Sequence, residues 1–114
     1  MKTFLFIAAA SLSLLMQQET KLKGVYKVYF DKGQQSYQMT FSDSTFVKKM
    51  PDAITYKGKI AYGKYVAVIR KNMEDDPIEI DNREFGKDTI KFSTKSKRDN
   101  SMTVNRGKMI RLKQ

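Results

Sequence analysis

The sequence predicts an all-β fold, a small antiparallel up-and-down meander of about eight to nine short strands that forms a barrel or a compact sandwich. Three observations predict it. Apolar and polar residues alternate with a period of two from residue 22 onward. The segments between these runs are short and rich in turn-forming residues. The length of 114 residues suits one domain, which we place at 19–114.

Residues 1–18 have the layout of a secretory signal peptide. Lys2 supplies a positive start, the stretch 4–16 is largely apolar, and polar chain follows. The apolar stretch is shorter than the roughly 17–25 residues that a membrane-spanning helix needs. We therefore expect export to the periplasm or the medium, with cleavage at an uncertain point near residues 17–20 and no transmembrane span in the mature chain. The alternative is a buried or interfacial N-terminal helix that is retained.

The first three expected strands cover 22–31, 36–42 and 45–50. In the first, Lys23 and Lys27 lie opposite a side formed by Leu22, Tyr26, Val28 and Phe30. The second alternates most clearly, because its apolar side consists of Tyr37, Met39 and Phe41. The segments 31–34, 42–44 and 50–53 hold the Asp, Gly, Ser and Pro residues that tight turns require.

The next two expected strands cover 54–62 and 65–71 and form a hairpin. The inward side of the first is expected to hold Ile54, Tyr56, Ile60 and Tyr62. Only Gly63 and Lys64 separate Tyr62 from Tyr65, and a leading glycine suits a two-residue type II′ turn. We therefore expect a two-residue loop at this point.

The last expected strands cover 78–81, 89–94, 102–105 and 108–113, with one helical turn within 82–88. In 89–94 the alternation places Ile90 and Phe92 inward and Lys91 outward. Gly107 stands where a three-residue hairpin loop would need a positive φ. The final two segments are therefore predicted to be separate strands.

The residues expected to face inward are bulky. An eight-stranded barrel is just wide enough to be filled by its own side chains or to hold one small ligand. We expect a filled interior, since this set includes ten large residues: Tyr26, Phe30, Tyr37, Met39, Phe41, Tyr56, Ile60, Tyr62, Ile90 and Phe92. The alternative is a ligand cavity lined by Tyr26, Phe30, Tyr37, Phe41, Tyr56 and Tyr62.

The chain is strongly basic, with a formal net charge of +10. The stretch 94–113 holds seven of the 22 basic residues and only one acid, Asp99. One interpretation is the solvated side of a β-hairpin. The other is an anion-binding patch for an anionic polymer or a lipid headgroup, formed by Lys95, Lys97, Arg98, Arg106, Lys108 and Arg111. Nucleic acid is disfavoured by the expected export and because, among the early strands, only Tyr29 clearly points outward as a base-stacking platform, while Phe46 and Tyr65 are ambiguous.

Catalytic sites are mostly excluded by composition. Without His or Cys, neither a Ser-His-Asp triad nor a thiol or imidazole zinc site can form. The acidic segment 73–88 lacks the alternating oxygen ligands of an EF-type calcium loop. A hydrolase with paired carboxylates stays formally open, but no motif places two carboxylates together. We expect no enzyme activity, catalytic residue, metal or cofactor.

Two features resemble the small secreted bacterial lipocalin-like β-barrel proteins. Gly24, Val25 and Tyr26 lie in the first expected strand, and Arg111 lies in the last. In that family a Gly-x-Trp motif places a Trp across one end of the barrel, packed against an Arg from near the end of the chain. The resemblance implies that Tyr26 and Arg111 meet in this way, although this chain has no Trp.

Three functional hypotheses follow. The first is an exported, non-catalytic domain that acts through protein contact, as an inhibitor, an immunity-type protein or an accessory protein, with its partner in the cell envelope or outside the cell. The second is a lipocalin-like binder of a small apolar ligand, which the resemblance implies. The third is a binder of an anionic polymer or lipid headgroup through the basic surface.

Overall fold

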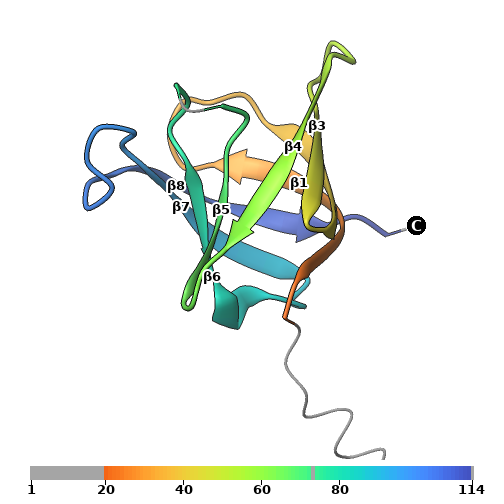
Figure 1. Ribbon diagram of the computed structural model, residues 1–114. Helices are drawn as coiled ribbons and strands as arrows, with labels where there is room; N and C mark the ends of the chain where they lie inside the picture. Colours follow the sequence, from red (N-terminus) through yellow and green to blue (C-terminus); the bar gives the residue numbers. More distant parts are fainter. Residues whose placement is uncertain (1–19, 73, 114) are drawn as a thin grey trace, which may run out of the picture.

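Eight antiparallel strands close into a single barrel, as the alternation predicts (Figure 1). The computed structural model describes residues 20–72 and 74–113, so the predicted signal peptide lies outside the described part. The strands are β1 (Leu22–Phe30), β2 (Tyr37–Asp43), β3 (Thr45–Lys49), β4 (Thr55–Tyr62), β5 (Val66–Ile69), β6 (Ile78–Asp81), β7 (Thr89–Lys95) and β8 (Thr103–Arg111). Each strand pairs with the next, and β8 pairs with β1. Within the described residues, no helix is both long and apolar enough to cross a membrane.

The connections gather at two ends of the barrel because successive strands run in opposite directions. One end holds Ser44, the turn 63–65 and the segment 82–88, which includes the 3-10 helix η1 (Asn82–Glu84). We call this the closed end. The other end holds the loops 31–36, 50–54, 70–77 and 96–102 (Figure 1). We call this the open end. The helical turn expected within 82–88 is therefore present, but it spans only three residues.

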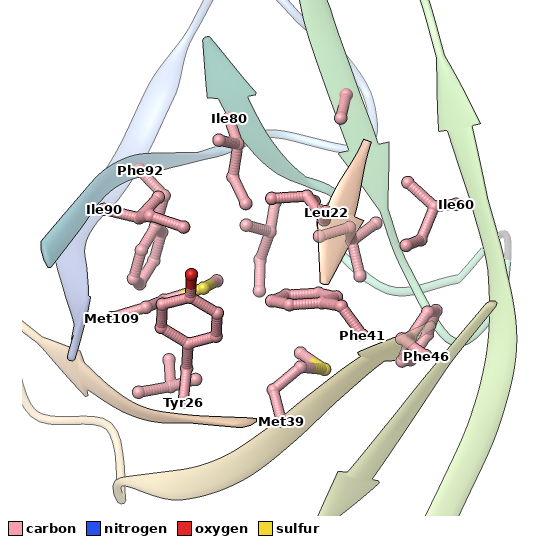
Figure 2. Close-up of a cluster of buried hydrophobic side chains, with 14 of the residues drawn as sticks. Leu22, Tyr26, Met39, Phe41, Phe46, Ile60, Ile80, Ile90, Phe92 and Met109 are labelled. Carbon is pink, nitrogen blue, oxygen red and sulfur yellow. The ribbon is translucent and has the colours of Figure 1, made fainter. Parts of the chain in front are cut away.

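Inward-facing apolar side chains fill the part of the barrel nearer the closed end. Figure 2 shows Tyr26, Met39, Phe41, Ile80 and Ile90 pointing toward a common interior. The predicted inward set is nearly correct, since most of its members are buried. Ile54 is an exception, because it lies just before β4 in an open-end loop and its side chain is 51% exposed. Tyr56 is only half-buried.

The last two predicted strands are one continuous strand, so the prediction of a hairpin at Gly107 is wrong. Gly107 lies in the middle of β8, opposite Phe92 on β7 and Phe30 on β1. A Cβ atom there would lie 2.1 Å from the Tyr29 carbonyl oxygen and 2.5 Å from the Phe92 ring. This glycine therefore permits a close approach of strands rather than a turn, a second reason for glycine within a β-sheet.

The turn after β4 also differs from the prediction. Tyr62 pairs with Ala67 rather than flanking a two-residue loop with Tyr65, and the Gly63 N–H donates to the Val66 carbonyl at 2.8 Å. The turn is therefore shifted by one residue, with Lys64 and Tyr65 at its centre, and Asn82 holds it in this position. Its side-chain amide donates to the Gly63 and Lys64 carbonyls at 3.2 and 3.0 Å, and its backbone N–H donates to the Tyr65 carbonyl at 2.8 Å. A residue distant in sequence thus sets the shape of the turn.

Tyr26 and Arg111 meet at the closed end, as the resemblance implies. The Arg111 guanidinium lies 4.9 Å from the centre of the Tyr26 ring, and its Nε donates to the Asp88 carboxylate at 3.1 Å. The Tyr26 hydroxyl donates to the Lys87 carbonyl at 3.2 Å. Gly24 has a φ of +111°, and a Cβ there would lie 2.6 Å from Arg111 Nη1, so glycine is required beside the guanidinium.

Candidate ligand-binding pocket

A pocket of about 390 Å³ opens at the open end of the barrel. This volume lies within the range of small-molecule sites, about 300–1,000 Å³. Its apolar lining comes from β1, β2, β3, β5, β6 and β8 and consists of Phe30, Tyr37, Met39, Phe46, Ile69, Ile78 and Val104. Gly58 opposite Phe46 helps to shape this lining, because a Cβ at Gly58 would lie 2.7 Å from the Phe46 ring. The interior is thus packed toward one end and hollow toward the other.

The residues predicted to line a cavity divide between these two regions. Phe30 and Tyr37 line the pocket, and their rings contact each other with centroids 5.8 Å apart. Tyr26 and Phe41 pack together in the filled region, with centroids also 5.8 Å apart. Two further predicted residues have other roles, Tyr62 and Tyr56.

Tyr62 belongs to the closed end. Its ring packs edge-on against Phe85 with centroids 5.9 Å apart. Its hydroxyl donates to the Asp43 carbonyl and accepts from the Leu22 N–H. Tyr56 lies toward the open end on β4, where its ring contacts two lysines, Lys48 and Lys71. Only Tyr56 of this pair can therefore influence the pocket.

Thr94 contributes a buried hydroxyl to the pocket. Its side chain is 7% exposed, and its Oγ1 has no hydrogen-bond partner among the described residues. Thr94 pairs with Ile78 and Asn105, and the register of β7 and β8 shifts immediately after it. A buried hydroxyl without a partner costs about 1–3 kcal/mol. A ligand with a polar atom in the pocket would remove this cost.

Two lysines and two tyrosines alternate beside the pocket. The Lys48 ammonium lies 4.2 Å from the centre of the Tyr37 ring and 5.9 Å from that of Tyr56. The Lys71 ammonium lies 4.1 Å from the centre of the Tyr56 ring. Cation–π contacts of this kind hold ammonium groups against apolar surface. They therefore position two positive charges at the pocket.

The charge on Lys48 is only partly balanced. Burial lowers the pKa of Lys48, the Asp75 carboxylate opposes this shift, and Lys71 adds to it. Burial also raises the pKa of the Tyr37 phenol, which keeps that hydroxyl neutral. The nearby Asp76 carboxylate accepts a hydrogen bond from the Lys97 backbone N–H at 2.9 Å. The ionisable residues that line the pocket are Lys48, Arg70, Lys71, Asp75 and Asp76, so cations outnumber anions.

Sequence reasoning missed Lys48 and Thr94. The sequence did contain an indication for Lys48. Lys48 lies two residues after the buried Phe46 in β3, and side chains two residues apart point to the same side of a strand. Thr94 likewise lies on the same side of β7 as Ile90 and Phe92, because these are alternate residues of one strand. Its lack of a partner, however, depends on which atoms surround it, and this information is not in the pattern.

The six residues of the predicted anion patch do not form one surface. Lys97 and Arg98 lie in the open-end loop, whereas Arg106 and Lys108 lie on the outward side of β8. Lys95 Nζ donates to the Thr103 hydroxyl at 2.8 Å, and Arg111 is held at the closed end.

The described residues include no group of three or more Asp or Glu side chains that could hold a metal ion. The pocket therefore offers a ligand the cationic groups of Lys48, Arg70 and Lys71, the Thr94 hydroxyl, the amides of Gln34 and Asn105, two carboxylates and apolar surface. Comparisons of the chain with protein-family models, with curated proteins and with solved structures found no match.

Proposed function

We propose that this protein binds a small ligand with an apolar body and one anionic group in the open-end pocket. The observation that carries the proposal is the buried, unpartnered Thr94 hydroxyl in a pocket that has an apolar lining and the Lys48 ammonium beside it. The apolar body would contact Phe30, Tyr37 and the aliphatic lining. The anionic group would accept hydrogen bonds from Lys48 or Thr94.

The charge of the ligand is inferred from Lys48. A half-buried ammonium loses hydration, and this burial lowers the pKa of Lys48 even though the Asp75 carboxylate opposes the shift. An anion would favour the charged form, and charge-assisted hydrogen bonds are about twice as strong as neutral ones. A cationic ligand would meet Lys48, Lys71 and Arg70 and would be repelled.

Two fluorescent probes of matched shape test this proposal. Anilinonaphthalene sulfonate carries one anionic group, and N-phenylnaphthylamine has the same ring system without it. We expect the full barrel to bind the sulfonate more tightly than the neutral probe. Lys48→Met should lower the affinity for the sulfonate about tenfold and leave the affinity for the neutral probe nearly unchanged. Lys57→Met is the matched control, since Lys57 is exposed on the outward side of β4. Equal binding of both probes would contradict an anion site.

Thr94→Val tests the hydroxyl separately from the charge. Valine keeps the shape and removes the unpartnered oxygen, so the free protein should become more stable by about 1 kcal/mol. The sulfonate probe should bind several-fold more weakly, and chemical denaturation and fluorescence titration would measure the two effects. A loss of stability without any change in binding would show that Thr94 Oγ1 has no part in the site.

Affinity for the sulfonate should fall as pH rises. Because only the charged form of Lys48 attracts the anion, binding weakens once this lysine begins to lose its proton in the free protein. The lowered pKa of Lys48 places the start of the fall below that of an ordinary lysine, whose pKa is about 10.4. In Lys48→Arg the guanidinium stays charged, so the fall should move to higher pH. Identical profiles for the two proteins would contradict the role of Lys48.

A protein partner, predicted from the composition, is a separate proposal. It requires no pocket ligand, and binding to a partner should survive Lys48→Met. Affinity purification from an envelope extract, with the wild type and this variant in parallel, would test it.

A further inference from the structure

The outward side of β8 and its two neighbours combines cations, of which Lys27 is half-buried and the others are exposed, with exposed apolar residues. We call this surface the β8 face and define it by Lys27 and Tyr29 on β1, Lys91 on β7, and Arg106, Lys108 and Ile110 on β8. The register places Lys108 between Lys91 and Tyr29 and places Ile110 beside Lys27. Each apolar side chain therefore has a cation beside it on the neighbouring strand, about 4.8 Å away, and Lys91 and Lys108 lie side by side.

The apolar members of the β8 face are exposed to solvent. Tyr29 is 40% exposed and Ile110 is 38% exposed. By contrast, the basic outward side of β3 and β4, which carries Lys49, Lys57 and Lys59, has no exposed large hydrophobic residue on either strand. The two basic surfaces thus differ in the apolar residues between the charges.

Among the described residues, Glu79, Asp81 and Glu84 line a surface depression together with Lys91 and Arg106, at one border of the β8 face. Glu84 accepts a hydrogen bond from the Lys91 backbone N–H at 2.9 Å, but its other oxygen pairs with Lys87 at 2.5 Å. Lys27 and Lys108 make no ion pair within the described residues, so their charges are available to a partner.

We propose that the β8 face docks on an anionic phospholipid surface. Lysine and arginine side chains near such a surface are attracted to its phosphates, and tyrosine side chains are favoured at the level of the headgroups. Ile110 would contact acyl chains just beneath them. A nucleic acid is the alternative polyanion, but its phosphates would leave Ile110 without an apolar partner. The proposal is independent of the pocket ligand.

Vesicle flotation tests the docking with two triple variants of equal charge. The first, Lys27→Gln with Lys91→Gln and Lys108→Gln, removes three of the four cations of the β8 face and leaves Arg106. The control, Lys49→Gln with Lys57→Gln and Lys59→Gln, neutralises the other basic surface. With vesicles of equal parts phosphatidylcholine and phosphatidylglycerol, we expect the first variant to bind at least tenfold more weakly. The control should lose only a few-fold, and pure phosphatidylcholine should not bind the wild type.

A further variant distinguishes binding to lipid from binding to other polyanions. Tyr29→Ser with Ile110→Thr leaves the charge unchanged and should weaken vesicle binding several-fold. It should leave any binding to a duplex DNA oligonucleotide unchanged. Equal losses in the two triple variants would overturn the proposal, because they would indicate attraction by net charge alone. Tighter binding to DNA than to the vesicles would also overturn it. Thermal melting confirms that each variant folds, and Lys48→Met should dock like the wild type, which separates this result from the pocket.

Discussion

Gly107→Ala is expected to destabilise the barrel by about 3 kcal/mol or more. The added methyl group would lie 2.1 Å from the Tyr29 carbonyl oxygen, a backbone atom that cannot move without separating β8 from β1. It would also lie 2.5 Å from the Phe92 ring. Phe92 is buried and packs edge-on against Phe30 with centroids 5.3 Å apart, so the ring has little room to turn away.

Gly33→Ala is the matched control for this prediction. Gly33 has a φ of +54°, and no atom lies within 4 Å of its expected Cβ position. The same substitution there should cost only about 1–2 kcal/mol, the penalty for a left-handed conformation. Urea denaturation of both variants would measure the difference as a shift in midpoint at unchanged slope. Similar losses at the two positions would show that β8 can move away from β1 and that Gly107 is not required for closure.

Tyr26→Ala is expected to cost about 3–5 kcal/mol, as large-to-small substitutions of buried aromatic residues do. Tyr26 is 1% exposed and contacts both Phe41 and the Arg111 guanidinium. Removing the ring leaves a cavity. It also takes away the ring that contacts the Arg111 guanidinium, which would keep its hydrogen bonds to Asp88 and to the Lys23 carbonyl. A domain of this size has a free energy of unfolding of only about 5–15 kcal/mol, so the variant should melt well below the wild type.

Tyr26→Phe separates the ring from the hydroxyl. Phenylalanine keeps the contacts with Phe41 and Arg111 and loses only the hydrogen bond to the Lys87 carbonyl. We expect a cost of about 1 kcal/mol. Calorimetric melting of the two variants would compare them. If Tyr26→Ala were as mild as Tyr26→Phe, the closed end would depend on the segment 82–88 and not on the packing of this ring.

The two ends of the barrel differ in whether their polar groups have partners. At the closed end, polar groups such as the Tyr26 hydroxyl and the Arg111 guanidinium have partners within the described residues. At the open end, Thr94 Oγ1 has none, and Lys48 is held near two aromatic rings without an ion pair within the described residues. A site that keeps such a cost in the free protein is suited to a ligand that removes it.

The alternation of apolar and polar residues predicted most of the fold and only part of the candidate site. The alternation in 36–42 predicted a strand with Tyr37 buried, and Tyr37 indeed lines the pocket. The same reasoning gave Tyr62 an inward side and, in the alternative of a ligand cavity, a place in its lining, but Tyr62 forms hydrogen bonds at the closed end. A residue's position in this alternation gives the side of the strand to which its side chain points. It does not give the height along the barrel at which one strand meets its neighbours.

The sequence by itself determined the fold class, the order of the strands and the inward side of most of them, because a two-residue period allows only one sidedness for a pleated strand. Only the tertiary structure decided that Gly107 joins two segments into β8, that Asn82 shapes the turn at 63–65, and that Lys48 and Thr94 lie at one pocket. These features depend on contacts between residues far apart in the chain. Such contacts are fixed by the register that closes the barrel, which no local pattern contains.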